Sequence, residues 1–202
     1  MKGNVSEKVG QKSRIVADAL EYAAVKHEGR ARKNPESRIP YIVHPVKVAM
    51  MLRDTGFDDE VVAAGLLHDT VEDSDATIEE LADRFGSRVA GMVEAVTEPS
   101  KDRSWKERQD AYLNKVRSAG TEVLAISACD KIDNMRSMLQ SLRAGHDIFG
   151  KLSAPVDRQL AKFDRLLEVY RGRVPEDLEL LFAGTLQDLR DGIAAFHEKH
   201  KP

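Results

Sequence analysis

The chain has 202 residues, and its 31 basic residues nearly balance 34 acidic ones, which leaves a net charge of −3. A general nucleic-acid-binding protein usually carries a basic excess, so this composition argues against that class. The single cysteine excludes an internal disulfide framework and is typical of a reducing cytosol. No stretch approaches the ~20 apolar residues that a membrane-spanning helix needs, and we expect no secretory leader in the polar N-terminus. We therefore expect a cytoplasmic globular protein with one sizeable core.

The first predicted helix covers residues 13–27, where Val16, Leu20, Ala23 and His27 fall on one face. A lone histidine on such a face is more typical of a structural hydrogen-bonding residue than of a metal ligand.

Residues 28–40 are predicted to form a polar loop, because two prolines and a glycine interrupt any regular pattern. The four cations of this loop are Arg30, Arg32, Lys33 and Arg38. Arginine and lysine donors suit phosphate oxygens, so the loop is either a solvated connector or an anion-binding edge. Pro45 fits the first turn of a helix over residues 45–53. His44 then lies just ahead of that helix, where its ring can point into a site.

The stretch 65–73 reads Gly-Leu-Leu-His-Asp-Thr-Val-Glu-Asp and follows an almost wholly apolar run, so its helix is predicted to be central and buried. At helical spacing His68 lies beside Glu72, and Asp69 lies beside both Glu72 and Asp73. Ionisable groups next to a buried segment are costly unless they are paired or hold a metal. The cluster is either a helix end with a solvated acidic tail or part of a metal or catalytic site.

Helices are predicted along the rest of the chain from amphipathic periodicity, capping boxes and stop glycines. Their approximate ranges are 58–73, 77–86, 87–96, 104–118, 121–143, 155–170 and 176–198. No strand pattern competes with them, so the predicted fold is all-α. We expect a core over residues 1–150 and C-terminal helices over 151–202 that pad this core or form a homo-oligomer contact.

A second cluster of interest lies in the predicted helix over residues 121–143. Asp130 lies among small, core-like residues, and Asn134 follows one helical turn later, so both can face one site. The plain alternative is a half-exposed polar stripe. A buried aspartate, by contrast, needs a partner.

The sequence offers a mixed nitrogen and oxygen set of candidate metal ligands: His44, His68, Asp69 and Asp130. Imidazole suits Zn, Fe, Ni and Mn, and the carboxylates move the preference toward Mn or Mg. A structural zinc site would be closed and sulfur-rich. Glu72 and Asp73 remain to orient or deprotonate a water whose pKa the cation lowers, while Arg32 and Lys33 can hold a phosphate. If these segments converge, they predict hydrolysis of a phosphoester or phosphoanhydride.

In their order, these motifs resemble the H…HD…D signature of the HD-domain metal-dependent phosphohydrolases. The segments that further resemble the hydrolase domain of RelA/SpoT-type alarmone enzymes are His27-Glu-Gly-Arg, Arg32-Lys33, Pro40-Tyr41-Ile-Val-His44-Pro45, Leu67-His68-Asp69-Thr70-Val71-Glu72-Asp73 and Asp130-Lys131-Ile-Asp-Asn134. At this length we expect neither the synthetase nor the regulatory domains of the long forms. The chain is therefore most similar to the stand-alone small alarmone hydrolases, over about residues 10–145, which implies an HD-domain helical bundle.

This resemblance implies a role for each candidate residue. The residues that match the family's Mn²⁺ ligands are His44, His68, Asp69 and Asp130. Glu72 and Asp73 match the acidic pair that activates the attacking water. Arg32 and Lys33 match basic residues of the substrate pocket, and Asn134 matches a residue near the substrate sugar. The implied reaction, part of the stringent response, removes the 3′-pyrophosphate of ppGpp or pppGpp and gives GDP or GTP and pyrophosphate.

Two departures bear on the substrate more than on the metal. The loop between Lys33 and His44 is slightly longer than the usual form, and Asp133 stands where an apolar or aromatic residue is commoner. The alternative is an HD phosphohydrolase that acts on another nucleotide, a dNTP or a nicotinamide cofactor phosphate such as NADPH, and other divalent metals suit the same ligands. The intact ligand set and the acidic pair argue against a non-catalytic nucleotide-binding module. A plain helical scaffold would not explain four ionisable groups at the end of the most buried helix.

Overall fold

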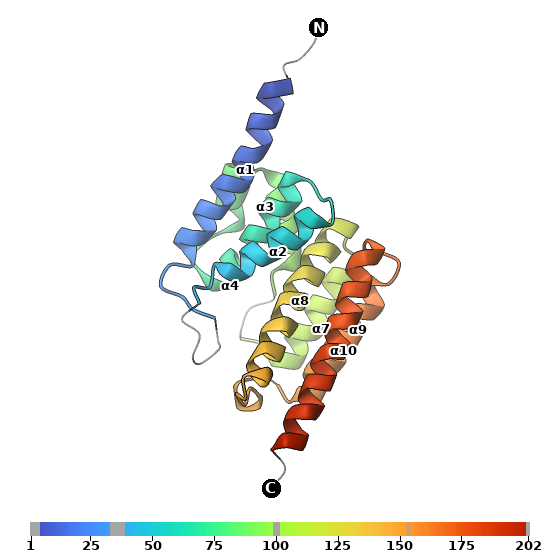
Figure 1. Ribbon diagram of the computed structural model, residues 1–202. Helices are drawn as coiled ribbons and strands as arrows, with labels where there is room; N and C mark the ends of the chain where they lie inside the picture. The colour runs from blue at the N-terminus through green and yellow to red at the C-terminus, as the bar shows by residue number, and fades with distance from the viewer. Residues whose placement is uncertain (1–4, 33–38, 99–101, 153, 201–202) are drawn as a thin grey trace. The chain divides into compact units, whose positions relative to one another are not determined.

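The computed structural model describes residues 5–32, 39–98, 102–152 and 154–200. Within these ranges every regular element is a helix (Figure 1), and a single β-bridge between Ala31 and Pro40 stands outside any strand. The predicted all-α class is confirmed. Among the described helices we find none with the length and apolar character to span a bilayer. The described chain divides after Thr97 into two compact units.

The first unit is built around the apolar helix predicted from the sequence. Its described helices are α1 (Val5–Lys26), α2 (Val43–Asp54), α3 (Asp59–Leu67), α4 (Thr70–Asp73), α5 (Ile78–Phe85) and α6 (Ser87–Val96). Every residue of α3 from Val61 to Leu67 is buried, and the helix contacts α1, α2 and α6. The prediction of a central, buried helix is confirmed.

The start of α3 is fixed by side chains. Asp58 is the N-cap, as its carboxylate accepts hydrogen bonds from the backbone N–H groups of Glu60 and Val61 at 3.1 Å each. Arg88 of α6 lies 2.9 Å from the carboxylate of Asp58 and 2.5 Å from that of Glu60. The same acidic turn therefore caps α3 and ties it to α6.

A glycine permits the close approach of α2 and α3. A Cβ atom added to Gly65 would lie 2.5 Å from Cδ1 of Leu52 and 3.5 Å from Cγ1 of Val48. Leu52 and Val48 are fully buried, so neither side chain has open space to move into. This contact determines how closely the end of α3 lies against the middle and the end of α2.

The prediction of one continuous helix over residues 58–73 is wrong, because the chain breaks between α3 and α4. The His68 ring binds back to the carbonyl of Gly65 (Nδ1 to O, 2.8 Å), and Thr70 Oγ1 donates to the carbonyl of Leu67 at 2.7 Å. Side chains thus satisfy carbonyl groups that a continued helix would bond to its own backbone. The break was invisible in the hydrophobic pattern.

The start of α2 also differs from the prediction. The chain already turns at Pro40, with Val43 N bonded to its carbonyl at 3.2 Å and His44 N bonded to the carbonyl of Tyr41 at 2.9 Å. The helix therefore begins at Val43, and His44 lies in its first turn rather than ahead of it. Pro45 is tolerated there because N–H groups of the first turn need no intrahelical acceptor.

The second unit is a set of longer helices. Its described elements are α7 (Trp105–Arg117), α8 (Thr121–Arg143), the 3₁₀ helix η1 (Phe149–Lys151), α9 (Val156–Tyr170) and α10 (Glu176–Lys199). Figure 1 shows α8 and α10 running side by side, and these two helices are in extensive contact. The capping box predicted at Ser104 and Glu107 is present at the start of α7.

A chain of buried hydroxyl groups joins three helices of this unit. The Ser127 hydroxyl on α8 lies 2.6 Å from that of Tyr112 on α7 and 2.7 Å from that of Tyr170 at the end of α9. Because each hydroxyl finds a partner, all three polar groups can be buried without a desolvation penalty.

Candidate metal centre

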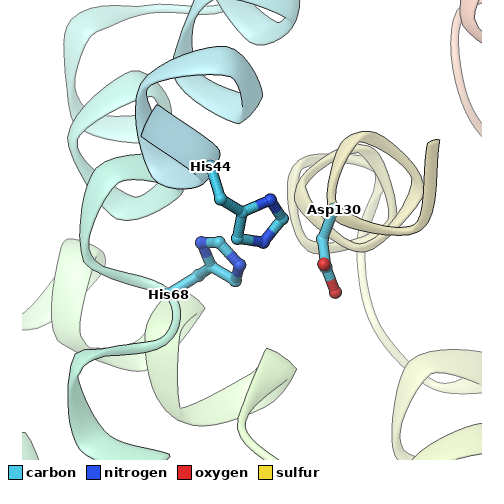
Figure 2. Close-up of side chains that lie close together, drawn as sticks. All are labelled: His44, His68 and Asp130. Atoms are coloured by element: carbon cyan, nitrogen blue, oxygen red, sulfur yellow. The ribbon is translucent and has the colours of Figure 1, made fainter. Parts of the chain in front are cut away.

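Two buried histidines from neighbouring helices face each other at the centre of the candidate site (Figure 2). His44 comes from the first turn of α2 and His68 from the residue that ends α3. Their ring centroids are 5.1 Å apart. The close packing of α2 on α3 at Gly65 accounts for this juxtaposition, which sequence spacing alone could not provide.

The carboxylate of Asp69 lies against both imidazoles. Its Oδ2 is 3.4 Å from Nε2 of His44, and its Oδ1 is 3.2 Å from Nε2 of His68. Tyr41 also donates its hydroxyl hydrogen to Oδ2 at 2.5 Å. Burial raises the pKa of Asp69, but the attraction of His68 and hydrogen bonds from both imidazoles outweigh it and hold that pKa well below its usual range. Asp69 is therefore an ionised carboxylate.

The hydrogen bond of His68 selects its tautomer. Nδ1 lies 2.8 Å from the carbonyl oxygen of Gly65, which can only accept, so Nδ1 carries the proton in the neutral ring. In the protonated ring Nε2 carries a hydrogen toward Asp69, and a bound cation would take the place of that hydrogen. This is the arrangement in which a histidine serves as a metal ligand while its other nitrogen is held in place.

The acidic pair on α4 is placed beside this cluster by the backbone. The N–H group of Asp73 bonds to the carbonyl of Asp69 at 3.0 Å, so these residues stay one turn apart in spite of the helix break. The Asp73 carboxylate pairs with Arg30 at 3.1 Å, and Arg30 also donates to the Asp73 carbonyl. Glu72 is half-buried on the same short helix.

Two arginines lie around the ring of Tyr41. The guanidinium carbon of Arg30 is 5.4 Å from the ring centroid, and that of Arg32 is 5.9 Å away. Arg32 is held at the bridge, where its N–H group donates to the carbonyl of Ile39 at 3.1 Å. The predicted substrate residue Lys33 lies outside the described residues.

Asp130, the candidate ligand of the second unit, is buried on α8 (Figure 2). Its carboxylate accepts from both neighbours on that helix: Lys131 Nζ lies 2.6 Å from Oδ2, and Asn134 Nδ2 lies 2.5 Å from Oδ1. Asp130 therefore does not belong to a half-exposed polar stripe, and it lies next to Asn134 as predicted. Asp133, the departure noted in the sequence, is also buried.

Lys131 is the cation that balances this buried carboxylate. Burial lowers the pKa of Lys131, but the charge of Asp130, followed by Tyr112 and Glu98, raises it well above its usual range. Its ammonium group also lies 5.0 Å from the ring centroid of Tyr112. Lys131 is thus a charged group in the core of the second unit.

Three residues of these clusters were not identified as site residues from the sequence: Arg30, Tyr41 and Lys131. Each stands inside a segment that carries the family resemblance, which was the available signal. The donor chemistry of the candidate ligands suits a divalent cation, because it combines imidazole nitrogen with ionised carboxylate oxygen. Carboxylates also keep spare lone pairs, since two oxygens offer about four acceptor positions.

Comparisons with known proteins agree with these motifs. Residues 19–154 match the family model of the HD domain. The chain is 37% identical over 126 residues to Danio rerio guanosine-3′,5′-bis(diphosphate) 3′-pyrophosphohydrolase MESH1. The aligned region covers 61% of this chain and 69% of the relative. The chain is 38% identical over 130 residues to the Aquifex aeolicus enzyme of the same activity, covering 63% of this chain but only 18% of that protein. A Myxococcus xanthus GTP pyrophosphokinase is 39% identical over 132 residues, which are 61% of this chain and 17% of that enzyme.

Solved structures give a similar result. A metazoan ortholog of SpoT that hydrolyses ppGpp matches with a TM-score of 0.70 and 28% identity, covering 86% of this chain and 94% of the other. A Listeria monocytogenes protein matches with a TM-score of 0.66 and 31% identity, over 76% of this chain and 99% of the other. The family match extends over more than half of the sequence and includes every candidate ligand. The chain therefore belongs to the HD domain family.

Proposed function

We propose that this chain is a metal-dependent phosphohydrolase that removes the 3′-pyrophosphate of guanosine alarmones, converting ppGpp or pppGpp to GDP or GTP and pyrophosphate. The observation that carries the proposal is the cluster of His44, His68 and Asp69, in which the two Nε2 atoms face one half-buried, ionised carboxylate. The substrate is supported by the relatives whose names state this activity and by the ppGpp-hydrolysing metazoan protein.

In this proposal one divalent cation, Mn²⁺, is held by four residues: His44, His68, Asp69 and Asp130. Neutral imidazole nitrogens together with carboxylate oxygens suit Mn²⁺, and other divalent metals can bind the same ligands. A single family match that spans both units supports the joining of Asp130 to the histidines. When bound, the cation lowers the pKa of a water and offsets charge on the phosphate oxygens.

The chain's own groups supply the proton transfer and the orientation. Glu72, together with Asp73, takes the proton of the attacking water, whose oxygen bonds to the 3′-linked phosphorus. The bond from phosphorus to O3′ breaks, and O3′ takes up a proton from solvent. Arg30 pairs with the Asp73 carboxylate and orients it. Arg32 and Lys33 hold substrate phosphates and the guanine base, and Asn134 lies near the sugar.

The chemistry is proposed to be confined to residues 1–150, which include nearly all of the family match. The helices of residues 151–202 then pack on the core or form a homo-oligomer contact. The proposed setting is the cytoplasm, with a small nucleotide as substrate and neither nucleic acid nor membrane as partner.

The test is a turnover assay on the full chain loaded with Mn²⁺, in which GDP and pyrophosphate are separated by ion-exchange chromatography. NADPH and dNTPs run in parallel, because hydrolysis of one of them without ppGpp turnover would replace the proposed substrate by the alternative. Absence of hydrolysis of all three substrate types would overturn the proposal.

The site assignment is tested by two variants and a control, with metal content measured by elemental analysis. Asp69→Ala should lose the metal and the activity. Glu72→Gln should keep the metal and lose turnover, whereas Glu79→Gln, a matched change at an exposed position on α5, should alter neither. Full metal and full activity in Asp69→Ala would show that the site is assigned to the wrong residues.

A further inference from the structure

We propose that a pocket between α7 and α9 is a second ligand site, which binds a nucleoside phosphate with its base against Trp105 and its phosphates among basic side chains. The pocket lies wholly within the second unit and has a volume of about 310 Å³. None of the candidate metal ligands lines it. The inference does not depend on the proposed reaction.

The aromatic wall is the indole of Trp105, the sole tryptophan of the chain. Trp105 is the first residue of α7 and is half-buried, directly after the Ser104 capping box that fixes this end of the helix. Apolar side chains, Leu113 and Leu166, complete the wall from the two helices. Stacking on an indole beside apolar side chains favours a flat aromatic base.

The charge of the pocket selects an anion. The cations that line it are Lys106, Arg158, Lys162 and Arg165. Lys106 and Arg165 share one carboxylate, Asp110, at 3.1 and 2.9 Å. Lys162 lies 3.9 Å from Glu98.

Arg158 makes no ion pair within the described part of the chain. Four cations thus line the pocket and none of its described lining residues is acidic, in a chain whose overall charge is −3. A local basic excess of this kind attracts phosphate, and the arginine forks can bind its oxygens in pairs.

The size of the pocket limits the ligand. A volume of about 310 Å³ is at the lower end of small-molecule sites, so it suits one nucleotide rather than a polynucleotide or a peptide segment. Tyr112 lines the pocket and also contacts Lys131, which donates to Asp130. Binding must therefore be measured so that the pocket and the metal centre are told apart.

The single tryptophan provides a direct readout, and GDP is the probe. The full chain is titrated with GDP, guanosine and pyrophosphate while tryptophan emission is followed, with excitation at the red edge of tryptophan absorption. GDP should change the emission saturably, whereas guanosine and pyrophosphate should each need at least about tenfold higher concentrations, because each lacks half of the recognised group.

Variants separate the pocket from other sources of signal. Arg158→Ala should weaken GDP binding at least about tenfold, whereas Arg171→Ala, a matched change at an exposed position outside the pocket, should leave it unchanged. His68→Ala should bind GDP normally. Circular dichroism of each variant confirms folding, and calorimetric titration of Trp105→Ala with GDP gives a second measurement, in which affinity should fall.

Three results would overturn the inference: no saturable change with GDP, equal affinities in Arg158→Ala and Arg171→Ala, or loss of the signal in His68→Ala. The last would place the bound nucleotide at the metal centre. A chain that binds GDP in this way but fails to hydrolyse ppGpp would refute the proposed function alone.

Discussion

Substituting Gly65 with alanine tests whether the close packing of α2 on α3 builds the histidine cluster. The added Cβ would lie 2.5 Å from Cδ1 of Leu52, which is fully buried, so the methyl group must displace either that side chain or the helix. Overpacking of this kind costs about 1–3 kcal/mol. The gain in helix propensity from glycine to alanine is about 1 kcal/mol and works in the opposite direction.

Gly91 offers a matched control within α6. It is exposed, and an added Cβ there would meet nothing within 4 Å, so Gly91→Ala should show the propensity gain alone. The difference in unfolding free energy between Gly65→Ala and Gly91→Ala then isolates the overpacking, about 1–3 kcal/mol. For a chain of this length that difference corresponds to about 2–12 °C in Tm.

The assay is urea denaturation of both variants, followed by circular dichroism, together with metal analysis after gel filtration. Because the Gly65 carbonyl holds the His68 ring, Gly65→Ala should also lose metal that Gly91→Ala retains. In a double-mutant cycle, Leu52→Val should relieve part of the cost, since valine lacks Cδ1. Equal stability of the two glycine variants would refute the reasoning.

Three further predictions concern other parts of the chain. Lys131→Met should destabilise the metal-free chain by about 3–5 kcal/mol in urea denaturation, because it leaves the buried carboxylate of Asp130 without its cation. Lys131→Arg should restore part of the loss. An unchanged denaturation midpoint in Lys131→Met would contradict the importance of the ion pair. The hydrogen bond from Arg88 holds the pKa of Asp58 below its ordinary value of 3.8, so its stabilisation is complete above that pH and is lost as the pH falls through the lower folded-state value. In Asp58→Asn the free energy of unfolding should therefore fall less steeply at acid pH than it does in the unchanged chain. Equal slopes in the two proteins would contradict this. Burial, with the charge of Asp130, raises the pKa of the Cys129 thiol to about 12, so iodoacetamide should label it only after unfolding in urea; rapid labelling of the native chain would disprove its burial.

Local signals predicted most helix boundaries well. The capping box at Ser104 and the charged first turn at Asp58 lie where the structure begins α7 and α3. Such signals depend on atoms within four residues of one another, which a sequence displays directly. The all-α fold followed from helical periodicity along the whole chain.

The features that the sequence did not predict depend on contacts between distant residues. The side chains of His68 and Thr70 end α3 in the middle of an apolar run, and nothing in the periodicity distinguishes them from residues of a continuous helix. The pairing of Arg30 with Asp73 joins residues 43 positions apart. The candidate site residues were predicted from residue chemistry and from motif resemblance, while their contacts with Arg30, Tyr41 and Lys131 required the folded structure.

The helix break at His68 also has an electrostatic consequence. The carbonyl end of a helix carries a partial negative charge of about half an elementary charge, which falls off within the last turn. Because α3 ends at this histidine, that negative end comes to lie beside the proposed cation. A chain in which α3 continued into α4 would lose this contribution, so the helix end at His68 would favour a cation bound there.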